Sequence, residues 1–239
     1  MQKSRDIVLL GDSIAKGIVQ SKSAKYELCS LSFAEGIAKF FDCKLSNWSR
    51  FGATIDKLWE IYERKSASLR GGETFILECG GNDCNFNWPE VAKRPGEEHE
   101  PLTGLERFAK LYGKLIERIA RQGSEIIILN LPPLVADRFF NTISKGLVAD
   151  NILEFIGGKT FSIYRWQEAY SNTLAQIANK FSVKLIDIRS PFLTERNYER
   201  LICTDGMHPN EKGHGLISRT LEVALAEYGL PICLRKTDK

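Results

Sequence analysis

The chain has 239 residues, and 33 Lys and Arg against 30 Asp and Glu give a formal net charge of +3 at pH 7. It contains no basic stretch interleaved with aromatic residues and no apolar segment of membrane-spanning length, so we expect no nucleic-acid partner and no membrane span. Chains of this length commonly form one domain, and we expect a single domain over residues 1–239.

The predicted strands and helices alternate along the chain. Apolar runs rich in β-branched residues predict strands at 7–10, 44–48, 74–79, 125–129 and 183–188. Helical periodicity predicts helices at 30–41, 53–65, 103–122, 161–181 and 211–228. The third helix has the clearest start, because Thr103 and Glu106 match a capping box. This alternation is typical of βαβ units and therefore of a parallel sheet.

Two connections are longer than those usual between strands and helices. We expect loop insertions near 84–101 and 133–159, and both contain aromatic residues, which argues against pure disorder. Long loops of this kind often shape a binding site, so these two segments are candidates for contacting the substrate.

The cysteines are scattered through the chain and form no Cys-x-x-Cys pair. They are Cys29, Cys43, Cys79, Cys84, Cys203 and Cys233. This pattern favours free thiols in a reducing compartment, and the apolar run at the N-terminus is too short for a signal peptide. We therefore expect a cytoplasmic protein. Cys79 and Cys84 flank a glycine-rich loop, but packing thiols are more common than a redox pair or metal ligands.

Polar or glycine-rich segments follow four of the predicted strands. Gly11-Asp12-Ser13 follows the first strand, Asn47–Ala53 the second, Gly80-Gly81-Asn82-Asp83 the third, and Asp205-x-x-His208 the fifth. Because the carboxyl ends of parallel strands share one edge of a sheet, these segments are expected to converge.

Each residue type in these segments has a chemical role in acyl transfer. Histidine is the side chain most often used as a general base near neutral pH, so His208 can take the proton of the Ser13 hydroxyl, while Asp205 can orient the imidazole. The tetrahedral oxyanion needs preorganised donors. The backbone N–H groups of Ser13 and Gly52 and the side-chain amide of Asn82 are the candidates.

At these residues the chain resembles the SGNH, or GDSL-type, hydrolase superfamily, and the resemblance spans almost the whole sequence. It implies a flavodoxin-like three-layer α/β/α sandwich with a five-stranded parallel sheet, order 2-1-3-4-5. It also implies the same catalytic residues and oxyanion donors as above. Ile14 replaces the leucine that gives the GDSL name, and Gly80 adds a second glycine before Asn82, but neither change alters the expected chemistry.

The remaining candidates surround these segments. We expect the substrate pocket to include Asp12, Ile14, Phe51, Phe86 and Trp88, although Asp12 can simply organise its loop and Phe51 can belong to the core. His99 is expected at the surface and His214 in packing. No histidine has the paired spacing of a hydrolytic zinc site, so we expect neither a metal nor another cofactor.

These observations predict a serine esterase. It would hydrolyse a small acyl ester, short-chain or O-acetyl, including an acyl group on a carbohydrate, through a covalent acyl-serine intermediate. One alternative is an acyltransferase that uses the same three residues. Another is a non-catalytic flavodoxin-like ligand-binding module, but residues 11–17 match no phosphate-binding loop and Asp12 would repel phosphate. The sequence leaves the oligomeric state open.

Overall fold

A computed structural model of the chain describes residues 6–21, 23–41, 44–227 and 229. At its centre is a five-stranded parallel sheet in the order β4-β1-β5-β6-β7. The strands are β1 (Ile7–Gly11), β4 (Leu45–Asn47), β5 (Thr74–Glu78), β6 (Glu125–Leu129) and β7 (Lys184–Ile186). Counted along the predicted strands, this order is 2-1-3-4-5, so the expected fold class is confirmed.

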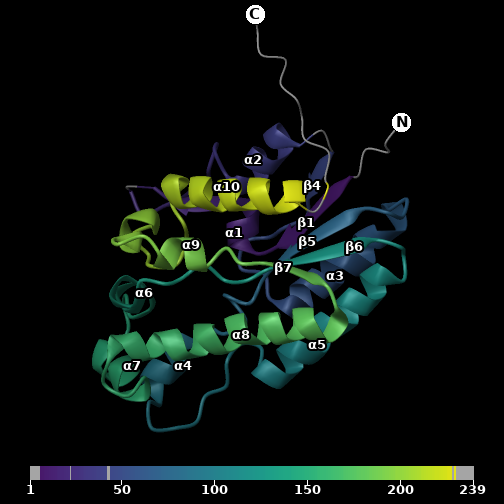
Figure 1. Cartoon of the computed structure of the whole chain (residues 1–239). Helices are drawn as coiled ribbons and strands as arrows, with labels where there is room; N and C mark the ends of the chain where they lie inside the picture. The colour runs from purple at the N-terminus through teal and green to yellow at the C-terminus, as the bar shows by residue number, and fades with distance from the viewer. Residues whose placement is uncertain (1–5, 22, 42–43, 228, 230–239) are drawn as a thin grey trace, which may run out of the picture.

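Helices cover both faces of the sheet, as Figure 1 shows. One face carries α2 (Phe33–Phe40) and α10 (Glu211–Glu227), and the other carries α3 (Ile55–Lys65), α5 (Leu105–Ala120) and α8 (Tyr164–Phe181). Four short helical segments also belong to this part of the fold, namely α1 (Ser13–Lys16), η1 (Ser66–Ser68), α9 (Ser190–Leu193) and η3 (Tyr198–Leu201). The helix predicted over 211–228 corresponds to α10, and its last predicted residue, Tyr228, lies outside the described residues.

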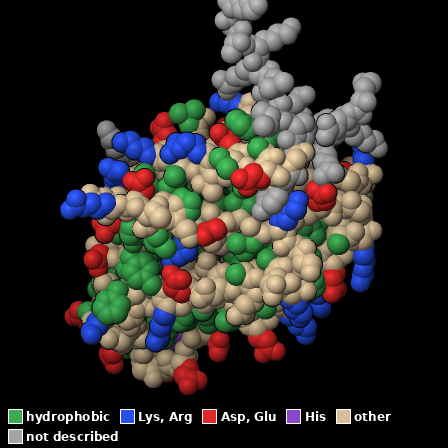
Figure 2. All heavy atoms as spheres, in the orientation of Figure 1, with side chains coloured by type: hydrophobic (Ala, Val, Ile, Leu, Met, Phe, Trp, Pro, Cys, Tyr) green, Lys and Arg blue, Asp and Glu red, His purple; other side chains and the backbone are tan. Residues whose placement is uncertain are grey.

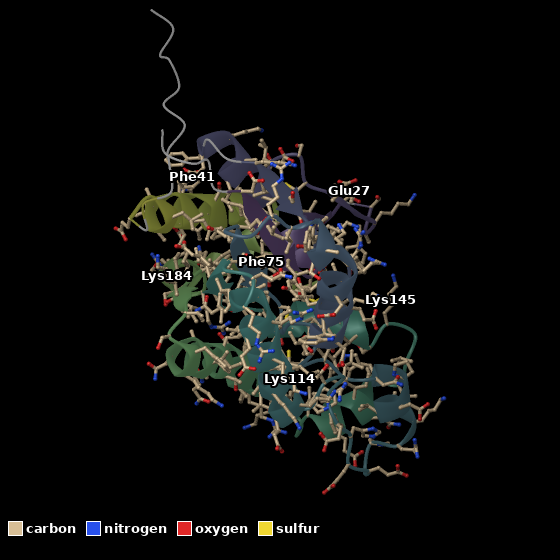
Figure 3. The ribbon with its side chains drawn as sticks, turned by 90° about the vertical axis from the view of Figure 1, so that its right-hand side faces the viewer. Glu27, Phe41, Phe75, Lys114, Lys145 and Lys184 are labelled. Atoms are coloured by element: carbon tan, nitrogen blue, oxygen red, sulfur yellow. The ribbon has the colours of Figure 1, made fainter. Side chains whose placement is uncertain are left out.

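Side-chain alternation along the strands divides the core into two layers. Val8 and Leu10 face the apolar cluster under α3, α5 and α8, whereas Ile7 and Leu9 face the cluster under α2 and α10. Figure 3 shows Phe75 of β5 in the middle of the molecule, where it is fully buried. Because both faces of the sheet are covered, its strands are apolar on both sides, and this made them recognisable in the sequence.

The second sheet is a small hairpin that the sequence did not predict. It pairs β2 (Ile18–Gln20) with β3 (Tyr26–Leu28) in antiparallel register. All three residues of β3 are exposed, so no buried face imposes a period-two pattern on its sequence. The hairpin is attached at Gln20, whose N–H donates to Cys203 Sγ (3.3 Å) and whose side-chain carbonyl accepts from the Thr204 hydroxyl (2.6 Å).

The two long connections contain helices and share an apolar cluster. The first includes α4 (Trp88–Lys93), and the second includes α6 (Ala136–Ile143) and α7 (Ala149–Phe155) and leads to η2 (Thr160–Ile163). We call these four segments the cap, which lies at one end of the molecule, on the left of Figure 1. Their buried cluster consists of Phe86, Trp88, Val91, Ala92, Leu134, Phe139, Ile152, Ile156 and Ile163.

The start of α5 differs from the predicted capping box. The helix begins at Leu105, with Gly104 as its N-cap, so Thr103 lies outside it. The Thr103 N–H donates to the Asp83 carbonyl (3.1 Å), and the Thr103 carbonyl accepts from the Tyr170 hydroxyl. Hydrogen bonds to the neighbouring loop and to α8 therefore determine how the chain enters this helix.

Charged side chains of both signs are intermixed on the face shown in Figure 2. This face therefore carries no large patch of one charge, and the expected lack of a nucleic-acid partner stays a prediction. None of the helices within the described residues is both long and apolar enough to cross a membrane.

Candidate active site

Ser13 lies where β1 ends and α1 begins, at the carboxyl edge of the sheet. Asp12 is the N-cap of α1, and its Oδ1 accepts a hydrogen bond from the Ile14 N–H (2.9 Å). Ser13 is the first residue of the helix, so its own N–H has no acceptor within the helix. Ser13 is 5% exposed, so only a small part of it is accessible to solvent.

The loop from Cys203 to Pro209 brings Asp205 and His208 to this serine. His208 Nε2 lies 2.8 Å from Ser13 Oγ, and His208 Nδ1 lies 2.7 Å from Asp205 Oδ2. Asp205 Oδ1 accepts the backbone N–H groups of Met207 (2.9 Å) and His208 (3.1 Å). The three side chains expected to act together thus form one continuous hydrogen-bonded chain, although 195 residues separate Ser13 from His208.

The cap holds the loop that carries Asp205 and His208. The Gly206 carbonyl accepts the Val135 N–H (2.8 Å), directly before α6. Gly206 has φ = +76°, and a β-carbon there would approach the Phe139 N–H nitrogen to 2.3 Å. A glycine is therefore required at this position both by backbone conformation and by the close approach of the cap.

The charge state of Asp205 suits its contact with the imidazole. Burial raises the pKa of Asp205, but the hydrogen bond and charge of His208 and two backbone donors outweigh it and hold this pKa below its usual range. An ionised Asp205 accepts from Nδ1, which leaves Nε2 free to accept the Ser13 proton. The arrangement can therefore activate the serine hydroxyl as a nucleophile.

Two aromatic rings cover His208 on the side of the hairpin. The Tyr26 ring lies 5.3 Å from the imidazole, and the Phe51 ring stacks on it at 6.1 Å with an interplanar angle of 15°. Both aromatic side chains remain partly exposed, whereas His208 is 1% exposed. Burial, together with the neighbouring Asp205 carboxylate, raises the pKa of Tyr26 to about 12. Sequence analysis missed Tyr26 because it belongs to the hairpin that no pattern predicted.

Of the candidate oxyanion donors, Ser13 and Asn82 line the same cavity, whereas Gly52 is not among its lining residues. Asn82 Nδ2 donates to Asp12 Oδ2 (3.2 Å) and to the Ala53 carbonyl (3.1 Å). An oxyanion would therefore share the Asn82 amide with these two acceptors or displace one of them. Gly52 has φ = +68°, and no heavy atom lies within 4 Å of the place where its β-carbon would be. The backbone at Gly52 is therefore left-handed and open to an approaching ligand.

A cavity of about 30 Å³ lies between Ser13 and the cap. Four of the expected pocket residues line it, namely Asp12, Ile14, Phe86 and Trp88. Further lining residues that sequence analysis missed are Cys84, Asn85, Leu131, Pro132, Leu134, Phe139, Ile163, Trp166, Gln167 and Met207. Phe51 is not among the lining residues and instead lies over His208. Four of the missed residues, Cys84, Asn85, Leu134 and Phe139, come from the two insertions, and most of the others come from segments that the short motifs do not reach.

The other histidines and cysteines lie apart from this chain of hydrogen bonds. His214 is fully buried against Phe33, with ring centroids 5.8 Å apart, and burial lowers its pKa to about 4. His99 packs edge-on against Phe155 at 5.3 Å. Cys79 and Cys84 are both free, and burial raises the pKa of each thiol, that of Cys84 to about 12. Cys43 and Cys233 lie outside the described residues.

Solved structures share this fold at low sequence identity. A lipase/acylhydrolase from Enterococcus faecalis is similar with a TM-score of 0.65 and 13% identity, covering 98% of this chain and 100% of the other. A protein of the lipolytic G-D-S-L family from Veillonella parvula has a TM-score of 0.64 and 16% identity, covering 93% and 99%. A catalytic mutant of an acetylxylan esterase from Geobacillus stearothermophilus has a TM-score of 0.63 and 15% identity, covering 96% and 97%.

The sequence itself matches the model of the GDSL-like Lipase/Acylhydrolase family over residues 9–216. No curated protein shows significant sequence similarity to the chain. Because the family match covers most of the sequence and includes both ends of the candidate site, the chain belongs to the GDSL-like lipase/acylhydrolase family, a family of ester hydrolases.

Proposed function

We propose that the protein is a serine esterase that hydrolyses a small acyl ester through a covalent acyl-Ser13 intermediate. The observation that carries this proposal is the hydrogen-bonded chain from Asp205 through His208 to Ser13, which reaches the wall of an apolar cavity. Family membership supports the reaction class. We also propose a single domain over residues 1–239, a cytoplasmic location, a small-molecule ester as the substrate, no nucleic-acid partner and no cofactor.

In the first half-reaction, Ser13 Oγ attacks the ester carbonyl carbon while His208 Nε2 takes the hydroxyl proton. The carbonyl oxygen becomes an oxyanion, for which Ser13 N–H, Gly52 N–H and the Asn82 amide are the donors. When the intermediate collapses, the bond to the alcohol oxygen breaks and the alcohol takes the proton from His208.

In the second half-reaction, water attacks the acyl-Ser13 ester. His208 takes a proton from the water and then returns it to Ser13 Oγ as the acid leaves, so the enzyme is regenerated. Asp205 stays ionised throughout and stabilises the imidazolium that forms in each half-reaction.

The size of the cavity supports a short acyl group. One water molecule needs roughly 10–15 Å³ of space measured at its centre, so a cavity of about 30 Å³ accommodates an acetyl-sized group better than a long chain. The aromatic side chains of Phe86 and Trp88 are among those that line it. One of the structural neighbours is an acetylxylan esterase, which is consistent with an acetyl ester, including one on a carbohydrate.

A chain-length series of p-nitrophenyl esters tests the proposal. We expect acetate to be the best substrate, with kcat/KM falling by about tenfold or more as the acyl chain lengthens beyond the cavity. Ser13→Ala should abolish hydrolysis with a native circular dichroism spectrum, whereas Ser68→Ala, which changes an exposed serine remote from the cavity, should retain it. Full activity in Ser13→Ala would refute the mechanism.

A further inference from the structure

Two buried carboxyl groups lie directly beneath Ser13, and the reaction as proposed assigns no role to Glu78. Asp12 is 2% exposed and Glu78 is 0% exposed. Their proximity follows from strand register, because Gly11 of β1 pairs with Glu78 of β5 and the Asp12 N–H donates to the Glu78 carbonyl (3.1 Å). The two carboxyl groups are also close enough for each to affect the pKa of the other.

The hydrogen-bond donors are divided unequally between the two carboxyl groups. Asp12 accepts the Ile14 N–H on Oδ1 and the Asn82 amide on Oδ2. Glu78 accepts only the Ala15 N–H on Oε2 (3.2 Å), and its buried Oε1 has no donor within the described part of the chain. Two carboxylates in contact in a dry site cannot both ionise, so the pair retains a proton. Asp12, with more donors, is the better place for the negative charge.

The neighbouring titratable groups also favour a proton on Glu78 and a negative charge on Asp12. The groups around Glu78 are Cys79 directly after β5, Asp83 on the following loop and Tyr112 on α5. Burial raises the pKa of both Cys79 and Tyr112, so these groups stay uncharged. Burial and the Asp12 carboxylate raise the pKa of Glu78 well above its usual range. The positive charge that His208 gains when it takes the Ser13 proton favours the ionised form of Asp12.

We propose, on the basis of the function proposed above, that Glu78 is a positioning residue that keeps its proton and donates it to Asp12. Asp12 then remains a carboxylate that holds both the first turn of α1, which carries Ser13, and the Asn82 amide. An ionised Glu78 would repel Asp12 and would place a second negative charge beneath the oxyanion, so its proton supports the transition state through Asp12 and Asn82.

Two substitutions at Glu78 separate hydrogen bonding from mere packing. Glu78→Gln keeps a donor for Asp12 and an acceptor for the Ala15 N–H, so kcat should stay within about threefold of the wild-type value. Glu78→Met fills similar space without a donor, and kcat should fall by about tenfold to hundredfold with KM changed by less than about threefold. At alkaline pH the wild-type kcat should fall as Glu78 ionises, and Glu78→Gln should lack that fall.

The proton on Glu78 can also be observed without any activity. In protein labelled with ¹³C at glutamate carboxyl groups, the infrared difference spectrum between wild type and Glu78→Gln at pH 7 should contain the carbonyl band of a protonated carboxylic acid. A difference spectrum with only carboxylate bands would overturn the proposal, and so would a Glu78→Gln enzyme as impaired as Glu78→Met. Because this spectrum needs no turnover, it still tests the shared proton if Ser13→Ala refutes the esterase mechanism.

Discussion

On the sheet side of Ser13, directional hydrogen bonds define the site, whereas on the cap side apolar packing defines it. The sheet side contains Asp12, Glu78 and Asn82. Asp12 and Glu78 accept the backbone N–H groups of the residues that follow Ser13, and Asn82 donates to Asp12. The cap side presents rings such as Phe86 and Trp88, which belong to a separate apolar cluster. We therefore expect the sheet side to determine the rate of the chemical step and the cap side to determine which acyl group fits. The predictions below separate the two contributions.

The largest effect is expected from His208→Ala. Without the imidazole, Ser13 has no base, and kcat should fall by about 10⁴-fold or more while the fold is retained. Steady-state hydrolysis of p-nitrophenyl acetate measures this loss. His99→Gln, which changes a histidine at the cap, should keep wild-type kcat, and an equal loss in both variants would contradict the assignment.

Asn82→Ala should produce the next largest effect. Loss of one oxyanion donor typically lowers kcat by about 10²–10³-fold, which corresponds to ~2.7–4 kcal/mol, and KM should change little. The substitution Asn179→Ala on an exposed part of α8 is a matched control. An increase in KM at unchanged kcat would instead assign Asn82 to ground-state binding.

Trp88→Ala should affect specificity more than rate. Shortening this ring enlarges the cavity on its cap side, so the ratio of kcat/KM for hexanoate to that for acetate should rise by about tenfold. The same ratio should be unchanged in Phe161→Ala, since Phe161 is 60% exposed. A uniform loss of activity on all esters would show that the cap supports the catalytic loop rather than selecting the acyl group.

The smallest effect concerns stability on the sheet side and involves Asp83. Burial raises the pKa of Asp83 from 3.8 to about 6, so the folded state binds more protons than the unfolded state between these values. The contribution of Asp83 to the free energy of unfolding is therefore present below about pH 4 and is lost as pH rises through 6. At about 1.36 kcal/mol for each pKa unit, it amounts to about 3 kcal/mol.

Asp83→Asn should remove this pH dependence, because the amide stays neutral and its oxygen can still accept the Ile55 N–H. Urea unfolding at pH 4, 5, 6 and 7 measures the difference. Asp150→Asn, at an exposed position, should follow the wild-type profile. If the free energy of unfolding changed with pH in the same way for wild type and Asp83→Asn, Asp83 would not be the cause of the pH dependence.

The sheet side of the site could be predicted from the sequence better than the cap side. The sheet, its order and the convergence of Ser13, Asp205 and His208 at one edge follow from apolar strands and short polar segments after them. These features are local in sequence, so they can be read one segment at a time.

The cap and the hairpin depend on contacts that are distant in sequence. The residues of the second insertion line the cavity because α6 packs on the loop at Gly206, and no pattern within the insertion encodes that contact. Tyr26 lies on a strand with no buried face. Glu78 continues an apolar run, and only strand register places it beside Asp12.

The role of Ser13 as the nucleophile can be tested directly by labelling with a fluorophosphonate and locating the adduct by peptide mass spectrometry. We predict one adduct per chain, on Ser13, with labelling lost in Ser13→Ala and strongly slowed in His208→Ala. An adduct on any other residue, or equal labelling of Ser13→Ala, would contradict the account.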